Sequence, residues 1–96
     1  MTQHIITTEA MAAFRRYLMA AERRPATIAK YLREVQAFTQ TLPPGGPVTK
    51  ETVLAWKRTL VQTHAPSTVN GKLAALNTFF SFLGWGEYRV KALRRQ

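Results

Sequence analysis

Residues 25–42 read PATIAKYLREVQAFTQTL, and residues 66–83 read PSTVNGKLAALNTFFSFL. The second stretch aligns on the first after a shift of 41 residues. The matching positions are the opening proline, a threonine and the apolar residues of one stripe: Pro25/Pro66, Thr27/Thr68, Ile28/Val69, Leu32/Leu73, Val35/Leu76, Phe38/Phe79 and Leu42/Leu83. Apolar residues three and four apart are typical of one helix face, and proline suits the first helical position. We therefore predict two equivalent amphipathic helices.

The same spacing predicts two more helices. One is capped by Thr7 or Thr8, ends near Glu22 and buries one face, made of Met11, Phe14, Leu18 and Ala21. The other is capped by Thr49, ends at His64 and buries Val53, Trp56, Leu60 and Val61. A connector of sequence PPGGP at residues 43–47 can neither continue a helix nor pair as a strand. The sequence thus predicts an all-α protein, a compact bundle of four, or at most five, short helices built from two helical hairpins.

Composition sets the broad class of the protein. The 96 residues are enough for one small domain, and 46% of them are hydrophobic, which is enough for a packed core. The absence of cysteine excludes disulfides, thiolate nucleophiles and zinc sites of the finger kind. Fourteen Lys and Arg against five Asp and Glu leave a net charge of +9, which points to a polyanionic partner.

The positive charge is densest at the start of the helix that begins with Pro25. Arg23 and Arg24 precede this proline, and Lys30 and Arg33 lie opposite the apolar stripe. These residues predict contacts with nucleic-acid phosphates, and the alternative is a solvated face. Tyr31 lies at the edge of the stripe, where its hydroxyl can reach a phosphate.

Small and polar residues gather at the start of the helix that begins with Pro66. The candidate binding residues there are Ser67, Thr68, Asn70 and Lys72, and Gly71 lets another backbone approach. Backbone N–H groups at a helix N-terminus attract phosphate oxygens. The alternative is that the two hydroxyls only satisfy the start of the helix.

Groups for catalysis or metal binding are not expected in this chain. The two histidines, His4 and His64, have no predicted partner, and no two of the five acidic residues are three or four positions apart. We therefore predict no enzymatic activity, no cofactor and no metal for this chain alone. No stretch is long and apolar enough to cross a bilayer, so we expect a soluble, cytoplasmic protein with no membrane partner.

Several motifs in order resemble a known family. They are FRRYL at residues 14–18, PATIAKY at 25–31, Val48-Thr49 with Trp56, and STVN at 67–70 followed by Phe79-Phe80. This set is similar to the N-terminal core-binding domain of tyrosine recombinases, the phage integrase family. The resemblance implies a SAM-like helical bundle in a bacterial or phage-encoded protein.

The resemblance also implies a function. In that family the domain and a separate C-terminal catalytic domain clamp double-stranded DNA, with the second and fourth helices along the major groove. Carried over by motif, the DNA-binding residues would be Thr27, Lys30, Tyr31, Ser67, Thr68, Asn70 and Lys72. Arg24 and Gly71 depart from the residues common at their positions. Double-stranded DNA, the catalytic domain of the same parent protein and other recombinase protomers are the expected partners.

The division of the chain follows from this interpretation. Residues 1–84 would form the core-binding domain, and residues 85–96 a basic linker leading towards an absent catalytic domain. Trp85 and Tyr88 could pack this linker back on the last helix. A different function remains open, because helical domains of this kind also serve as protein-interaction or oligomerisation modules, for which these two aromatic residues would be suited.

Overall fold

The computed structural model describes residues 4–43 and 45–93, and these contain helices and connecting segments but no strand. The four α-helices are α1 (Thr8–Ala20), α2 (Pro25–Thr39), α3 (Lys50–Thr63) and α4 (Pro66–Leu83), followed by one short 3-10 turn, η1 (Gly86–Tyr88). The predicted all-α fold is therefore confirmed. Pro44 of the predicted connector and residues 94–96 of the predicted linker lie outside the described residues.

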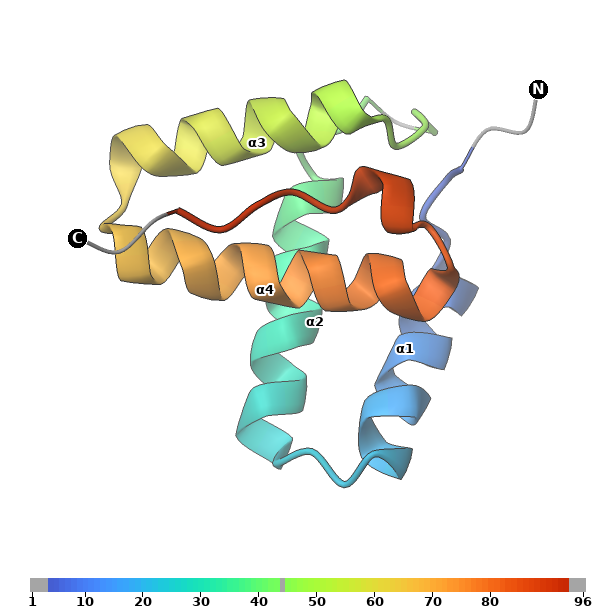
Figure 1. Cartoon of the computed structure of the whole chain (residues 1–96). Helices are drawn as coiled ribbons and strands as arrows, with labels where there is room; N and C mark the ends of the chain where they lie inside the picture. Colours follow the sequence, from blue (N-terminus) through green and yellow to red (C-terminus); the bar gives the residue numbers. More distant parts are fainter. Residues whose placement is uncertain (1–3, 44, 94–96) are drawn as a thin grey trace.

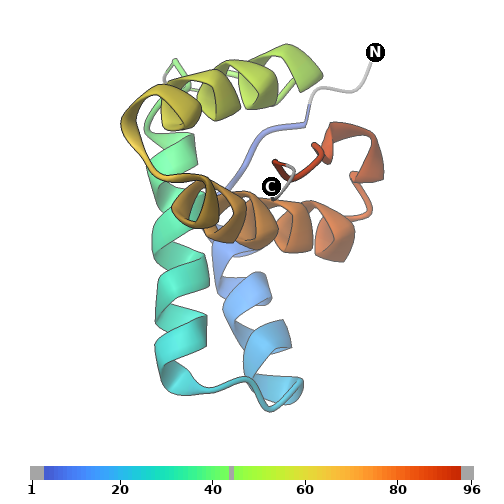
Figure 2. The ribbon, with the colours of Figure 1, turned by 60° about the vertical axis from the view of Figure 1, so that its left-hand side comes forward.

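The helices form two antiparallel pairs that cross each other (Figure 1). Helices α1 and α2 run side by side in opposite directions, and α3 and α4 form the second pair. Helix α4 lies across α2 in both views, and these two helices make the most extensive contact between elements (Figure 2). The two members of the sequence repeat are thus packed on each other.

Local chemistry explains where the helices start and end. Thr7 accepts a hydrogen bond from the backbone of Ala10 at 3.0 Å, and Thr49 and Thr52 each accept one from the other's backbone N–H. These contacts satisfy N–H groups that have no partner within the helix. Helix α4 ends at Gly84, whose φ of 76° is the left-handed conformation that favours glycine.

The core joins both helical pairs. Its fully buried members include Phe14, Phe38, Phe79 and Phe80, and rings from α1, α2 and α4 contact one another within it. The matched pairs Ile28/Val69, Val35/Leu76 and Phe38/Phe79 are all buried, as the repeat predicts.

Three details differ from the prediction. Ala21 was expected on the buried face of the first helix, but it is exposed and follows Ala20, the last residue of α1. Helix α2 ends at Thr39 and not near Leu42, because the hydroxyls of Thr39 and Thr41 bind main-chain carbonyls at its end and Pro43 follows. Val61 was predicted to be buried, but it is 47% exposed. Its neighbour Leu60 occupies the core-facing position, and a residue one step along a helix points about 100° away.

Residues 85–93 return along the surface of the molecule. Trp85 and Tyr88 pack on Phe80, with ring centroids 6.3 and 5.8 Å from it, so the predicted packing of these two rings on the last helix is confirmed. The chain then runs back between α3 and α4 (Figure 1), and Val90 is buried there. The boundary after residue 84 stays a prediction.

Candidate nucleic-acid interface

Lys30 of α2 and Gly71 of α4 lie close together where these helices cross. Gly71 of α4 has no side chain, and the Nζ atom of Lys30 lies 3.3 Å from the point where a Cβ of Gly71 would stand. A larger residue at position 71 would press on this ammonium group. The missing side chain lets Lys30 lie beside the start of α4, close to the residues predicted there.

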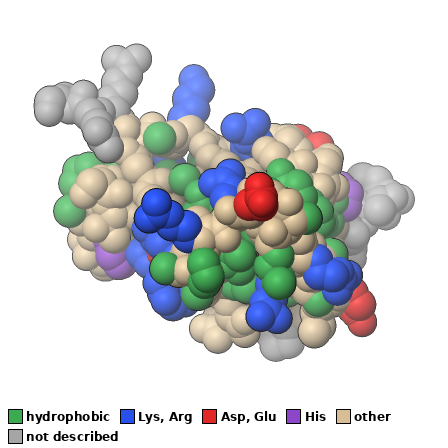
Figure 3. Space-filling view, turned by 90° about the horizontal axis from the view of Figure 1, so that it is seen from below, with side chains coloured by type: hydrophobic (Ala, Val, Ile, Leu, Met, Phe, Trp, Pro, Cys, Tyr) green, Lys and Arg blue, Asp and Glu red, His purple; other side chains and the backbone are tan. Residues whose placement is uncertain are grey.

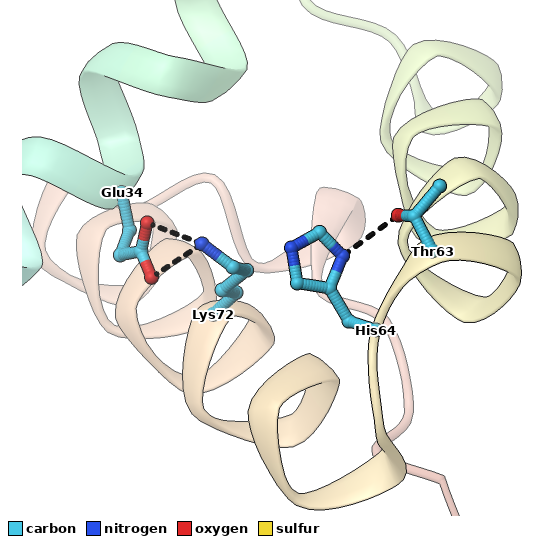
Figure 4. Close-up of polar contacts among 4 residues, drawn as sticks. All are labelled: Glu34, Thr63, His64 and Lys72. Atoms are coloured by element: carbon cyan, nitrogen blue, oxygen red, sulfur yellow. Dashed lines mark hydrogen bonds and ion pairs between the residues drawn. The ribbon is translucent and has the colours of Figure 1, made fainter.

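A buried ion pair links the same two helices. Both carboxylate oxygens of Glu34 accept hydrogen bonds from Nζ of Lys72 at 2.9 Å (Figure 4). Glu34 is only 5% exposed, and the Lys72 side chain is 20% exposed. Buried charges are tolerated when they are paired and hydrogen-bonded. Lys72 therefore holds α2 against α4, and its ammonium is already engaged within the protein.

Three of the predicted cations are solvent-exposed on α2 or at its start: Arg24, Lys30 and Arg33. Within the described residues, none of them forms an ion pair. Thr27 and Tyr31 are half-buried beside them. This part of α2 therefore presents positive charge that no neighbouring acid neutralises.

Ser67 and Thr68 are exposed in the first turn of α4, and neither hydroxyl has a hydrogen-bond partner in the described part of the chain. The helix has no side-chain cap, and the residue in the cap position is Ala65. Within the described residues, these hydroxyls therefore do not cap the helix. Both hydroxyls and the backbone N–H groups of this turn are available to a ligand.

Asn70 lies on the same turn, but its side chain is occupied elsewhere. Its Nδ2 donates to the carbonyl of Leu93 at 3.1 Å, and its Oδ1 accepts from the backbone N–H of Leu93 at 2.7 Å. The amide group therefore holds the returning chain. Of the nine predicted site residues, Asn70 and Lys72 are the two whose polar groups already have partners inside the protein.

Helix α1 adds charge that sequence reasoning did not assign to the site. Arg15 of α1 and Arg23 line a groove between α1 and α2, together with the apolar residues Met19, Pro25 and Ile28. Figure 3 shows this end of the molecule from below, with Lys and Arg side chains spread over it around an acidic one. Sequence reasoning missed Arg15 because Glu9 and Glu22 balance Arg15 and Arg16 along residues 1–22, although Arg15 forms no ion pair within the described residues.

The expectation that His4 has no partner is wrong. Its Nδ1 lies 2.8 Å from the Tyr88 hydroxyl and 3.8 Å from a carboxylate oxygen of Glu87, and its ring stacks on Trp85 at 4.6 Å. His4 and these residues are too far apart in the sequence for spacing to reveal the contact. The second histidine, His64, has its Nδ1 2.7 Å from the hydroxyl of Thr63 (Figure 4).

These histidines do not create a metal centre. In residues 4–43 and 45–93, no group of three or more His, Cys, Asp or Glu side chains could hold a metal ion. None of the helices in these residues is long and apolar enough to cross a membrane.

A comparison with protein families identifies the family of the chain. The family model described as phage integrase, N-terminal SAM-like domain, matches residues 11–87, which include all four helices except the first turn of α1. The chain belongs to this family. Neither the curated proteins nor the solved structures include a match to this chain.

Proposed function

We propose that this integrase SAM-like domain binds double-stranded DNA through the surface where α2 and α4 cross. One observation carries the proposal: exposed Arg24, Lys30 and Arg33 have no acidic partner in the described residues, and Lys30 lies against Gly71 in the N-terminal half of α4. Phosphate groups are the ligands that such an arrangement fits.

Each group has a distinct part in this proposal. Arg24, Lys30 and Arg33 neutralise phosphates, and Ser67 and Thr68 donate hydrogen bonds to phosphate oxygens at the positive end of the α4 dipole. Thr27 and Tyr31, half-buried on α2 beside the cations, add hydroxyl contacts. Contacts of this kind position a duplex rather than read its sequence.

Lys72 and Asn70 have supporting parts. The ion pair of Lys72 with Glu34 fixes the crossing of α2 and α4, and therefore the distance between the two sets of phosphate contacts. One N–H of the Lys72 ammonium is left over after the two bonds to Glu34 and can still face a phosphate. Asn70 contributes indirectly, because its amide group holds the backbone of Leu93 in the segment that returns along α4.

The wider function follows from the family. We infer that the domain holds the recombination site of a tyrosine recombinase while a separate C-terminal domain cleaves and joins the strands. Residues 85–96 would lead towards that domain, and other protomers would bind the same DNA. Trp85 and Tyr88, the residues that suited a protein-interaction module, are half-buried against Phe80, which leaves less of them for a partner.

Salt dependence of duplex binding is the first test. We expect log K to fall against log salt with a slope of roughly −4 to −5, since about four to six neutralised phosphates contribute about −0.9 each. The measurement is fluorescence anisotropy of a labelled duplex over a salt series. A monomer that binds duplex supports the proposal, and a stable oligomer that is indifferent to duplex supports the protein-interaction alternative.

Charge removal locates the surface. The double variant Lys30→Ala/Arg33→Ala should lose about tenfold or more in affinity at 0.1 M salt and make the slope shallower by about 2. The matched control is Arg16→Ala/Arg58→Ala, which removes two exposed cations from α1 and α3. Equal losses in the two double variants would show that only net charge matters and would overturn the assignment to α2 and α4.

A further inference from the structure

Residues 89–93, here called the strap, are held against α3 and α4 by hydrogen bonds. The strap lies between α3 and α4 and runs antiparallel to α4 (Figure 1). Asn77 bonds both the N–H and the carbonyl of Val90, at 3.0 and 2.8 Å, and Asn70 does the same for Leu93. Two amide side chains therefore hold the main chain of the strap at two points.

The spacing of Asn70 and Asn77 along α4 matches the spacing of the two strap residues that they bind. Asn70 and Asn77 are two helical turns apart, about 10.5 Å along α4. Val90 and Leu93 are three residues apart, which is about 9 to 10 Å in extended chain. Arg89 at the start of the strap has φ −66° and ψ 142°, close to polyproline II values. The strap thus fits α4 in one register.

Helix α3 holds the other edge of the strap. Lys50 donates to the carbonyl of Arg89, and Lys57 donates to the carbonyl of Lys91 at 2.6 Å. These two lysines are also seven residues apart, on the helix that runs antiparallel to α4. The side chain of Val90 is buried, and that of Leu93 packs on the core. Main chain and side chains of the strap are therefore both bound.

Arg89, the first residue of the strap, adds a positive side chain to the surface that carries Lys30. Arg89 lines a cleft along the exposed face of α4, together with Ala74, Thr78 and Ser81. Lys30 flanks α4 at Gly71, on a different side of this face from Asn70 and the strap. Arg89 forms no ion pair within the described residues. The exposed face of α4 consequently has a positive side chain on each flank.

We propose that the strap is a docked element of the DNA-binding surface, and that strap docking and DNA binding stabilise each other. This inference rests on the proposed function. Asn70 and Asn77 are positioning residues that act through the strap, because they place Arg89 beside the exposed face of α4. If a docked strap raises the affinity for DNA, then bound DNA must favour the docked strap by the same factor.

The test combines hydrogen exchange with duplex binding. In Asn77→Ala, the amide of Val90 should exchange about tenfold faster or more, and duplex affinity should fall about fivefold, within the range common for coupled sites. The salt slope should become shallower by about 1, the share of one phosphate contact. In the unaltered protein, saturating duplex should slow hydrogen exchange at Val90 and Leu93 about fivefold, the same factor by which loss of strap docking lowers duplex affinity.

A second variant and a control keep the result interpretable. Val90→Ala weakens the strap without altering α4 and should reproduce both effects, and Gln62→Ala, an exposed amide on α3, should produce neither. Faster exchange at Val90 with unchanged affinity and slope would overturn the coupling while leaving the proposed function intact. Failure of the unaltered protein to bind any duplex would instead overturn the proposed function, and the coupling with it.

Discussion

At the scale of single residues, the chemistry of the site depends on which polar groups are already occupied. Lys30 and Lys72 are both lysines on the crossing helices, but in the described part of the chain only Lys72 pairs with a carboxylate. Lys30 is exposed, and Lys72 is largely covered. A residue type that suggests phosphate binding can thus serve to join two helices instead, depending on its neighbour across the interface.

Removing one member of the Glu34–Lys72 pair should destabilise the protein. Lys72→Met leaves the Glu34 carboxylate buried without a partner and should lower the free energy of unfolding by about 2 to 4 kcal/mol, at the lower end of the range for buried pairs because Lys72 is partly exposed. Urea denaturation followed by circular dichroism measures the loss.

Two further variants control that experiment. Glu34→Leu/Lys72→Met replaces the whole pair by apolar side chains and should recover most of the stability. Lys30→Met changes an exposed lysine on the same surface and should have an effect near zero. If Lys72→Met behaves like Lys30→Met, the ion pair does not hold the helices together.

At the scale of elements, helix ends follow from local chemistry that the sequence displays. Thr49 and Thr52 satisfy each other's backbone N–H groups at the start of α3, and Gly84 ends α4 in a left-handed conformation. The starts of α2 and α4 carry proline without a side-chain cap, so these two helices keep N–H groups at their first turns without intrahelical partners. For α4, this turn is part of the proposed DNA surface.

Loss of the α3 cap should have a measurable cost. Thr49→Ala removes the hydroxyl that accepts from Thr52 and should lower the free energy of unfolding by about 1 kcal/mol. Thr59→Ala is the matched comparison, because the Thr59 hydroxyl bonds only the carbonyl of Ala55 in its own helix and alanine favours the helix. Thermal unfolding compares the two, and equal stability of both variants would contradict the role of the cap.

At the scale of the whole molecule, one core joins both helical pairs. Phe38 of α2 contacts Trp56 of α3 and Phe80 of α4, and Phe14 of α1 contacts Phe79. His4 and the turn η1 close the same core at one end through Trp85 and Tyr88. The two helical hairpins therefore have no separate cores on which to fold independently.

Unfolding should accordingly be a single cooperative transition. Tryptophan fluorescence reports on Trp56 and Trp85 in the second half of the chain, whereas far-ultraviolet circular dichroism reports on all four helices. We expect both signals to change at the same urea concentration with the same slope. Separate midpoints would show that α1 and α2 unfold independently of the rest.

The sequence by itself determined the four helices, the Thr49 cap of α3 and the equivalence of α2 and α4. These features depend on periodicity and on residues within one or two helical turns, which can be recognised along the chain. Arg24, Lys30 and Arg33 were recognisable for the same reason, because a charge opposite an apolar stripe must face outwards.

Only the tertiary structure decided which polar groups find partners. The Glu34–Lys72 pair joins residues 38 positions apart, the His4–Tyr88 contact spans 84, and Asn70 reaches Leu93 across 23. Local sequence patterns do not reveal contacts between residues so far apart in the chain, because these contacts form only when separate helices pack and bring distant side chains together. Packing therefore made Asn70 and Lys72 supports of the surface and left the cations of α2 available to a ligand.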